Sequence, residues 1–431
     1  MTPLRSWITR LRDTSSPLFN TYCIAVAFGA YFCMYAFRKP FSVGVFEGSV
    51  DLPVLPAIDY KILLIISQVI GYTISKFVGI KVISELPAHR RALGILAIIG
   101  FAELALLGFG LTPAPWSLLF LFLNGLPLGM VWGMVFGFLE GRRSTELLGA
   151  GLSASYIVSS GMVKTVGRWV LAEGVGEAWM PFITGLIFVP ALILFVFLLN
   201  LIPPPSKEDE KVRVKREPMD QHQRKRFLLS LAPGLLALTG LYMLLTAYRD
   251  FRDNFAREIW DAVGHGGEPA IFTYSEIPSA FAVLLALALI MMVRNNRRAL
   301  GVMHGVMISG TVLIGVSTLA FQFHFVGPVI WMVSVGVGLY LAYVPYGCML
   351  FDRLIACIGV TATAGFMIYV TDAFGYLGSV GLLLYKNFGQ PDLDWLPFFI
   401  GLSYLTSILC TLSFCFSWGY FHRRTKKPTP Y

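Results

Sequence analysis

Long apolar stretches alternate with short polar turns along nearly the whole chain. A bilayer has a hydrocarbon core about 30 Å thick, which an α-helix of about 20 apolar residues can cross. On that basis the pattern predicts twelve membrane-spanning helices. They lie at roughly residues 19–41, 59–83, 92–111, 116–139, 147–171, 180–201, 228–251, 271–293, 299–321, 327–350, 361–385 and 395–419. The sequence therefore predicts an all-α membrane protein.

One connector is longer and more polar than the others. Residues 203–226 read PPPSKEDEKVRVKREPMDQHQRKR, which holds few apolar side chains. We interpret this segment as a cytoplasmic linker between two six-helix bundles, residues 1–202 and 227–431.

The two bundles share features in the same order. The turn after the second predicted helix reads HRRALG, and the turn after the eighth reads NRRALG. The first helix has Tyr31 seven residues before Arg38, and the seventh has Tyr242 seven residues before Arg249. Two matched features in register indicate a duplicated, pseudo-symmetric six-helix unit. Parallel repeats with the binding site at their interface are typical of alternating-access transporters.

Composition supports the membrane assignment. Hydrophobic residues make up 56% of the 431 residues and charged residues 14%, against about 45–50% and about 25% in soluble domains. The net charge of +9 does not indicate a nucleic-acid binder, because the basic residues follow the sides of the predicted membrane topology. The six cysteines all lie in apolar stretches, so we interpret them as small buried residues and not as a disulfide framework.

Lysine and arginine set the predicted orientation. If the N-terminus is cytoplasmic, 23 of the 34 basic residues lie on that side of the membrane. Positive charges gather in cytoplasmic loops, so we expect both termini and the linker to be cytoplasmic. No small-residue cleavage site follows the first apolar run, and no cleavable signal peptide is expected. We place the protein in the cell inner membrane, spanning it many times.

Charged side chains inside the predicted helices are candidates for function, because each costs at least about 2.5–3.5 kcal/mol on insertion scales. The candidates are Arg38, Lys39, Lys76, Lys164, Arg168, Arg249, Asp250, Glu276 and Asp372, with Glu103 and His304 behind them. The alternatives are that Arg38, Lys164 and Arg168 reach the membrane surface along their apolar stems. Arg249 can instead belong to an ion-pair cluster at a helix end, and Glu103 and His304 can be structural.

Helical spacing groups several of these residues with tyrosines. Tyr31, Tyr35 and Arg38 share one face of the first helix, as do Tyr72 and Lys76 on the second. Tyr242, Thr246 and Arg249 repeat the first spacing, and Tyr369, Asp372 and Tyr376 form a polar stripe on the eleventh helix. A guanidinium presents a planar fork of donors that matches phosphate or carboxylate, and tyrosine adds hydroxyl donors. We therefore expect one arginine from each half to bind an anion in a shared cavity.

No other chemistry has a comparable pattern. The histidines show no metal-ligand spacing, and no nucleophile–base set or phosphate-binding glycine loop is visible. We expect no metal, no cofactor and no enzymatic activity.

Several motifs resemble one family of transporters. The runs YFCMYAFRKPFSV and IGYTISKF in the first two helices, with PYGCML and TATAGFMIYVTDAFGYLGS later, resemble the organophosphate:phosphate antiporters of the major facilitator superfamily, which include glycerol-3-phosphate and hexose-phosphate transporters. The matched residues are Tyr31, Tyr35, Arg38, Lys39, Tyr72, Lys76, Arg249, Tyr346, Gly347 and Gly375 to Gly378.

The resemblance implies a twelve-helix major facilitator fold and a monomer. It implies that Arg38 and Arg249 hold the phosphate of an organic phosphate, which exchanges for inorganic phosphate by rocker-switch alternating access. With it we predict that Lys76 and Lys39 assist, and that Tyr31, Tyr35, Tyr72, Tyr346 and Tyr376 shape the site.

The acidic residues leave the coupling and the substrate open. Asp372 is predicted either to pair with a cation, Lys76 or Lys164, or to contact a positive group on the substrate. Asp372 or Glu276 can take up a proton, which would make the protein a proton-coupled symporter of a carboxylated, sulfated or zwitterionic anion. A transporter-like membrane receptor for a phosphorylated ligand is a further alternative, which the short linker disfavours.

Overall fold

The fold is described from a computed structural model of residues 3–14, 16–52, 55–206, 209, 229, 231–358, 364–390 and 393–425. The chain packs into two compact units. Unit 1 consists of Met1–Val212, Asp253–Tyr274 and Leu383–Asp392, and unit 2 of Arg213–Arg252, Ser275–Leu382 and Leu393–Tyr431. Most of the predicted linker, including residues 210–226, lies outside the described residues. The division into halves at 1–202 and 227–431 stays a prediction.

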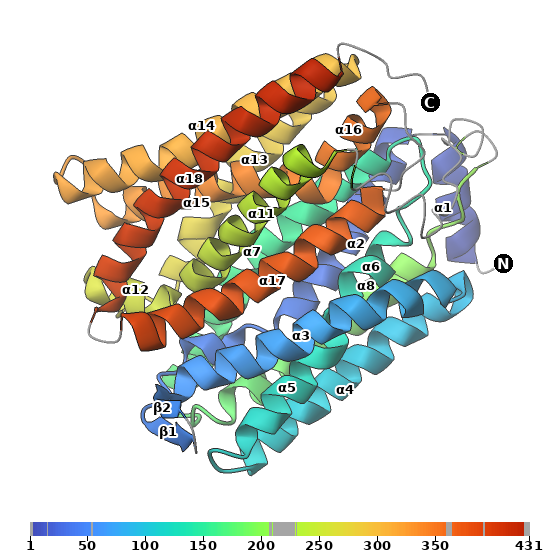
Figure 1. The fold of residues 1–431 in the computed structure, drawn as a ribbon. Coiled ribbons are helices and arrows are strands. Elements are labelled where there is room, and N and C mark those ends of the chain that lie inside the picture. The colour runs from blue at the N-terminus through green and yellow to red at the C-terminus, as the bar shows by residue number, and fades with distance from the viewer. Residues whose placement is uncertain are drawn as a thin grey trace. The chain divides into compact units, whose positions relative to one another are not determined.

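A helix corresponds to each predicted span (Figure 1). The first six spans are α2 (Ser16–Tyr35), α3 (Tyr60–Glu85), α4 (Arg91–Leu111), α5 (Ser117–Leu128) with α6 (Val131–Phe136), α7 (Thr145–Ala172) and α8 (Met180–Asn200). The last six are α11 (Ala232–Asn254), α13 (Ile271–Met291), α14 (Asn296–Gln322), α15 (Pro328–Cys348), α17 (Ala364–Gly389) and α18 (Trp395–Arg424).

Nine of the helices in the described residues are long and apolar enough to cross a membrane by length and composition. The remaining three predicted spans correspond to α7, α11 and α17, which carry charged candidates such as Lys164, Arg249 and Asp372. The fold is thus all-α and of the membrane-spanning kind, with the predicted chemistry concentrated on its more polar helices.

Short elements that the hydrophobic pattern did not predict lie between the long helices. They are α1 (Pro3–Thr14), α12 (Ala256–Ala262), α16 (Leu350–Ile358), the 3₁₀ helices η1 (Pro40–Val43) and η2 (Ala88–Arg90), and the strands β1 (Ser49–Leu52) and β2 (Leu55–Asp59). The strands pair antiparallel, with Ser49 opposite Asp59 and Val50 opposite Ile58. A search for apolar stretches of about 20 residues does not detect segments as short as these.

Glycines let the long helices pack closely within each unit. A Cβ atom on Gly71 of α3 would lie 2.2 Å from the carbonyl oxygen of Phe122 in α5, so the two backbones are in direct contact. In unit 2 a Cβ atom on Gly310 of α14 would lie 2.5 Å from the carbonyl oxygen of Gly338 in α15. Small residues at helix contacts are the usual means by which membrane helices approach one another.

Candidate functional site

The end of α2 positions Arg38. The sequence predicted a helix through residue 41, but α2 ends at Tyr35 and the chain continues as turns into η1. Pro40 has no N–H group and so cannot donate the next α-helical hydrogen bond, although Lys39 before it keeps a helical conformation at φ −99° and ψ −25°. The amides of Ala36, Phe37 and Arg38 bond to carbonyls three residues back, which is the tighter 3₁₀ pattern. The predicted span was therefore wrong at its C-terminal end.

Two polar side chains satisfy the carbonyl groups that this break releases. Asn124 on α5 donates to the carbonyl oxygen of Phe37 at 2.9 Å. Gln68 on α3 donates to the carbonyl oxygen of Arg38 at 3.1 Å and to Asn124 Oδ1 at 2.8 Å. A carbonyl without a partner at membrane depth costs several kcal/mol. These contacts fix the backbone that presents Arg38.

Three of the predicted unit 1 residues lie together. The guanidinium carbon of Arg38 lies 3.8 Å from the ring centroid of Tyr72, and Lys76 Nζ lies 5.4 Å from the same centroid. Arg38 is only 4% exposed, and Lys76 is also buried. The rings of Tyr31 and Tyr35 are buried and pack edge to face with centroids 5.7 Å apart. Unit 1 thus gathers two cations around one tyrosine ring.

Lys39 and Lys164 lie on either side of a carboxylate that belongs to unit 1. Each lysine forms an ion pair with Asp253, and Ser160 donates to the same side chain. Lys39 also donates to Asn254 Oδ1 at 2.9 Å. Asp253 thus offers one carboxylate oxygen to each of the two lysines, and the partner predicted for Asp372, either Lys76, Lys164 or a positive group on the substrate, stays a prediction.

Arg249 lies at the polar centre of unit 2. It bonds to Asp250 Oδ1 through Nε at 3.1 Å and through Nη2 at 2.7 Å, while Ser379 donates to the other oxygen of Asp250 at 2.7 Å. Its Nη1 donates to the hydroxyl oxygen of Tyr343, and Nη2 lies 3.4 Å from that of Tyr376. The ion pair proposed as an alternative is present, and tyrosine hydroxyls contact the same guanidinium.

Asp372 reaches the same group of tyrosines. Its Oδ1 accepts a hydrogen bond from the hydroxyl of Tyr242, whose oxygen lies 2.7 Å from that of Tyr343. The Tyr346 ring packs on Tyr242 with centroids 4.9 Å apart, but its hydroxyl donates to the carbonyl of Leu238. Unit 2 therefore brings together Asp372, Arg249 and their tyrosines, with Tyr346 contributing its ring.

Glu276 has a buried partner of its own. Arg252 donates from Nη1 to Glu276 Oε1 at 2.6 Å and from Nη2 to the carbonyl of Met332 at 3.1 Å. The two side chains are 4% and 11% exposed. The structure thus places Glu276 in an ion pair apart from the Arg249 contacts described above.

The other charged candidates lie elsewhere. Arg168 donates to the carbonyl oxygen of Gly266 at 2.7 Å. His304 contacts the carbonyl of Leu300 at 2.8 Å and the hydroxyl of Ser417 at 3.2 Å, which satisfies both ring nitrogens. Glu103 on α4 lies against Gly185 of α8, and neither carboxyl oxygen has a hydrogen-bond partner among the described residues. The side chain of Tyr369 lies outside the described ones.

Sequence reasoning did not single out Tyr343, Gln68 or Asn124. Tyr343 precedes Tyr346 by three residues, so the two share a face of α15, and that spacing could have identified it. Gln68 and Asn124 are polar residues within apolar runs, a signal that a search restricted to charged residues overlooks.

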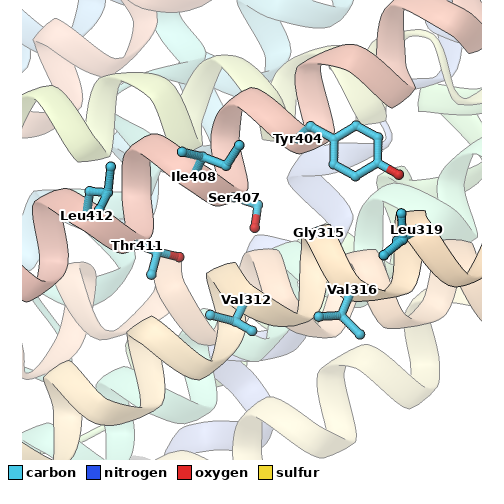
Figure 2. Close-up of a pocket in the computed structure, with 9 residues that line it drawn as sticks. All are labelled: Val312, Gly315, Val316, Leu319, Tyr404, Ser407, Ile408, Thr411 and Leu412. Atoms are coloured by element: carbon cyan, nitrogen blue, oxygen red, sulfur yellow. The ribbon is translucent and has the colours of Figure 1, made fainter.

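A separate groove lies between α14 and α18 of unit 2 (Figure 2). Its volume is about 420 Å³, and it is lined by apolar side chains such as Val312, Val316 and Leu319 of α14 and Ile408 and Leu412 of α18, which Figure 2 labels. Gly315 and Ser407 lie close together within it. No predicted site residue lines the groove, so it offers no charged group to an anion.

The arrangement suits anion binding more than covalent chemistry. Arg38 in unit 1 and Arg249 in unit 2 each have a tyrosine ring against the guanidinium. Within the described residues, no group of three or more histidine, cysteine, aspartate or glutamate side chains could hold a metal ion. The arginine and tyrosine side chains in these two groups can donate hydrogen bonds.

Comparison with solved structures identifies the fold. The crystal structure of the D-xylose-proton symporter matches with a TM-score of 0.60 at 14% identity, covering 94% of this chain and 98% of that one. A mutant of the nucleoside transporter NupG matches with a TM-score of 0.60 at 13% identity, covering 92% and 99%. Both of these proteins are named as transporters. The likeness shows the major facilitator fold, as the sequence predicted.

Comparison with curated proteins finds none that matches. A family model does match, over residues 40–424, and its description is "Family of unknown function (DUF5690)". That range covers most of the chain and includes Arg249, Tyr343 and Asp372, so the protein belongs to this family of unknown function.

Proposed function

We propose that the protein is a secondary transporter that moves a small organic anion across a membrane by alternating access. The substrate class is a phosphorylated metabolite, and the exchanged species is inorganic phosphate. The observation that carries this proposal is the setting of Arg249, whose guanidinium lies beside the hydroxyls of Tyr343 and Tyr376. A guanidinium with neighbouring hydroxyl donors matches the oxygens of a phosphate group.

Residues of unit 1 take complementary roles in the proposal. Arg38 and Lys76 supply positive charge beside Tyr72, while Tyr31 and Tyr35 shape the surroundings. Lys39 is paired with Asp253 and assists when that pair opens. The resemblance of the YFCMYAFRKPFSV and IGYTISKF runs to organophosphate:phosphate antiporters supports the choice of substrate.

Proton-coupled symport is the second candidate. Asp372 hydrogen-bonds to Tyr242, which contacts the tyrosine bound to Arg249. A carboxyl group linked in this way to the anion-binding arginine can couple proton uptake to anion binding. Glu276 is less suited, because it is paired with Arg252.

Proteoliposome transport distinguishes the two candidates. Vesicles loaded with inorganic phosphate should take up external labelled phosphate or sugar phosphate by exchange, and empty vesicles should not. Uptake into empty vesicles that needs an inward proton gradient would instead establish symport. A thermal-shift panel of phosphate, sulfate, sugar phosphates, glycerol 3-phosphate and uronic acids identifies the anion. Saturation at a hundredfold excess over Kd stabilises the protein by about 2.7 kcal/mol. If no anion in the panel is transported and none stabilises the protein, the proposal is refuted.

A further inference from the structure

A second groove of unit 2 follows the C-terminal end of α18. Its volume is about 430 Å³. The side chains that line it form two columns with a spacing of four residues, which places each column on one side of the helix. The first column is Cys415, Gly419 and Arg423, and the second is Phe416, Tyr420 and Arg424. The groove is therefore apolar toward the middle of α18 and basic at its end.

Gly419 keeps this groove open. Beyond its chain neighbours and the backbone of its helix, a Cβ atom at Gly419 would have no atom of the described residues within 4 Å, so no close packing contact requires glycine there. Glycine also favours a helix less than almost every other residue, so helix formation does not explain it either. The rings of Phe416 and Tyr420 stack with centroids 6.4 Å apart. The result is a notch at the level of Gly419 with an aromatic wall beside it.

The length of α18 determines which part of a membrane the groove meets. Its 30 residues rise about 45 Å, which exceeds a hydrocarbon core of about 30 Å and reaches the headgroup layer. The last turn holds His422, Arg423 and Arg424, and the helix contains no aspartate or glutamate. Cys415 and Phe416 precede the two arginines by about 12 Å along the helix axis. We therefore expect the arginines to lie among phosphate headgroups and the apolar end of the groove to lie against acyl chains.

The apolar end of the groove continues along α18. Ile408, Leu412, Cys415 and Gly419 follow one another at spacings of four, three and four residues, so they lie on one face of the helix. Ile408 and Leu412 line the apolar groove between α14 and α18 that Figure 2 shows. The two grooves thus lie in succession on the same face. An extended apolar chain that enters beside Phe416 can continue past Leu412 into the second groove.

We propose that this groove binds an anionic phospholipid, with its phosphate at Arg423 and Arg424 and an acyl chain along Phe416 and Leu412. Guanidinium groups match the oxygens of a phosphate in charge and geometry. The guanidinium carbon of Arg424 lies 5.8 Å from the ring centroid of Tyr420, so this cation stays beside the aromatic wall. A lipid also gains from contact with the apolar side chains, which a free phosphate ion does not. The site belongs to α18 and does not rest on the proposed function.

Native mass spectrometry of the purified protein tests the site by titration with phosphatidylglycerol and with phosphatidylcholine of the same acyl chains. We expect the wild type to bind phosphatidylglycerol more tightly. Arg423→Gln and Arg424→Gln should each weaken that binding about fivefold, which corresponds to about 1 kcal/mol. Gly419→Leu should lose it, because the leucine fills the notch without meeting another residue at its Cβ. Gly401→Leu is the matched control: it places leucine at another open position of α18, outside the groove, and should bind as the wild type does.

Several outcomes would overturn the lipid site. Equal affinity of the wild type for the two lipids, or wild-type affinity in Gly419→Leu, would show that the groove does not select an anionic lipid. Displacement of phosphatidylglycerol by inorganic phosphate alone would show that the groove takes the free anion. Basic residues also stabilise the C-terminal end of a helix without any lipid. If that is the whole role of the arginines, the variant with both Arg423→Gln and Arg424→Gln will melt at a lower temperature without lipid and still bind phosphatidylglycerol as the wild type does.

Discussion

The guanidinium groups of Arg38 and Arg249 have similar surroundings although they belong to different units. Arg38 lies 3.8 Å from the ring centroid of Tyr72, and Arg249 lies 4.6 Å from that of Tyr343. A cation over an aromatic face gains roughly 0.5–2 kcal/mol, and the gain is larger when water is excluded. The tyrosine ring holds each guanidinium, and in unit 2 the N–H groups of Arg249 donate to oxygens of Asp250 and Tyr343.

We predict that lysine cannot take over the anion-binding role of Arg38 or of Arg249. Arg38→Lys and Arg249→Lys keep the charge but lose the planar fork, so each should weaken anion binding by about 2–5 kcal/mol, roughly 30- to 4000-fold. The double variant should be little worse than the worse single one, because the second loss acts on a site already broken. Counterflow and binding in proteoliposomes provide the measurement. Near-normal exchange in a single variant would show that its arginine is not a substrate ligand.

We predict that replacing Glu103 changes the stability of the protein but not its transport. It is 8% exposed, and neither oxygen has a hydrogen-bond partner among the described residues. Glu103→Met keeps an unbranched side chain beside Gly185 and removes the buried polar group, so it should stabilise the protein by about 1–3 kcal/mol. Melting in detergent measures this, with Glu173→Gln at the exposed end of α7 as the control. A lower melting temperature for Glu103→Met would show that the carboxyl group has a partner in the folded protein.

At the residue scale the sequence predicted cations and tyrosines but not their pairings. The seven-residue spacing of Tyr242 and Arg249 predicted a shared helix face, and both side chains contact the hydroxyl of Tyr343 in unit 2. The bond between Tyr343 and Arg249 joins residues 94 positions apart, and helical periodicity holds no information about such contacts. The same limit explains why the sequence did not predict the pairing of Lys164 with Asp253.

At the element scale, the length of each apolar stretch predicted that a helix is present. The residue at which the helix ends depended on backbone chemistry instead. The predicted spans each correspond to a helix, but α2 ends before Pro40 and the fourth span is divided into α5 and α6 near Pro127. A hydropathy window averages over such positions, because one proline among about 20 apolar residues changes the mean very little. The break after α2 is the feature that gives Arg38 its position.

The break after α2 should depend on Asn124. Asn124→Ala leaves the carbonyl of Phe37 without its donor and removes the bond to Gln68. A buried group left unsatisfied costs about 1–3 kcal/mol, so this variant should melt at a lower temperature and bind anions more weakly through Arg38. Asn200→Ala, at the C-terminal end of α8, is an exposed control that should be neutral. Wild-type stability of Asn124→Ala would show that the turn does not need this bond.

We predict that Asp253 contributes more to the stability of unit 1 than a carboxylate in an exposed ion pair does. It contacts both Lys39 and Lys164. Asp253→Asn keeps the shape but leaves two buried lysines without their carboxylate, which should cost about 3–5 kcal/mol. Asp261→Asn, which affects a looser pair with Arg257 at 3.5 Å, is the matched control and should change stability little. Equal melting temperatures for the two variants would contradict this interpretation.

At the scale of the whole molecule, the sequence predicted the fold class through duplication and apolar length. The RRALG repeat and the paired Tyr–Arg spacings predicted two related bundles, and the solved transporters share the fold over more than nine-tenths of the chain. The substrate could not be predicted from the fold, because a fold held together by apolar helix contacts is compatible with many different polar binding sites. In the proposed function, side chains such as Arg249 and Asp372 determine the substrate.

The membrane orientation is the prediction that belongs to the whole chain. With 23 of the 34 lysines and arginines on one predicted side, both termini and residue Asp209 should be cytoplasmic. Reporter fusions after Asp209 and after Tyr431 should be active in the cytoplasm. A fusion after Gly174, which follows α7, should be active on the opposite side and serves as the control. Because these positions are separated by predicted spans, one inverted helix would change the readings downstream of it only. Fusions after Asp209 and Tyr431 that both appear outside, with Gly174 inside, would invert the whole topology and refute the charge argument.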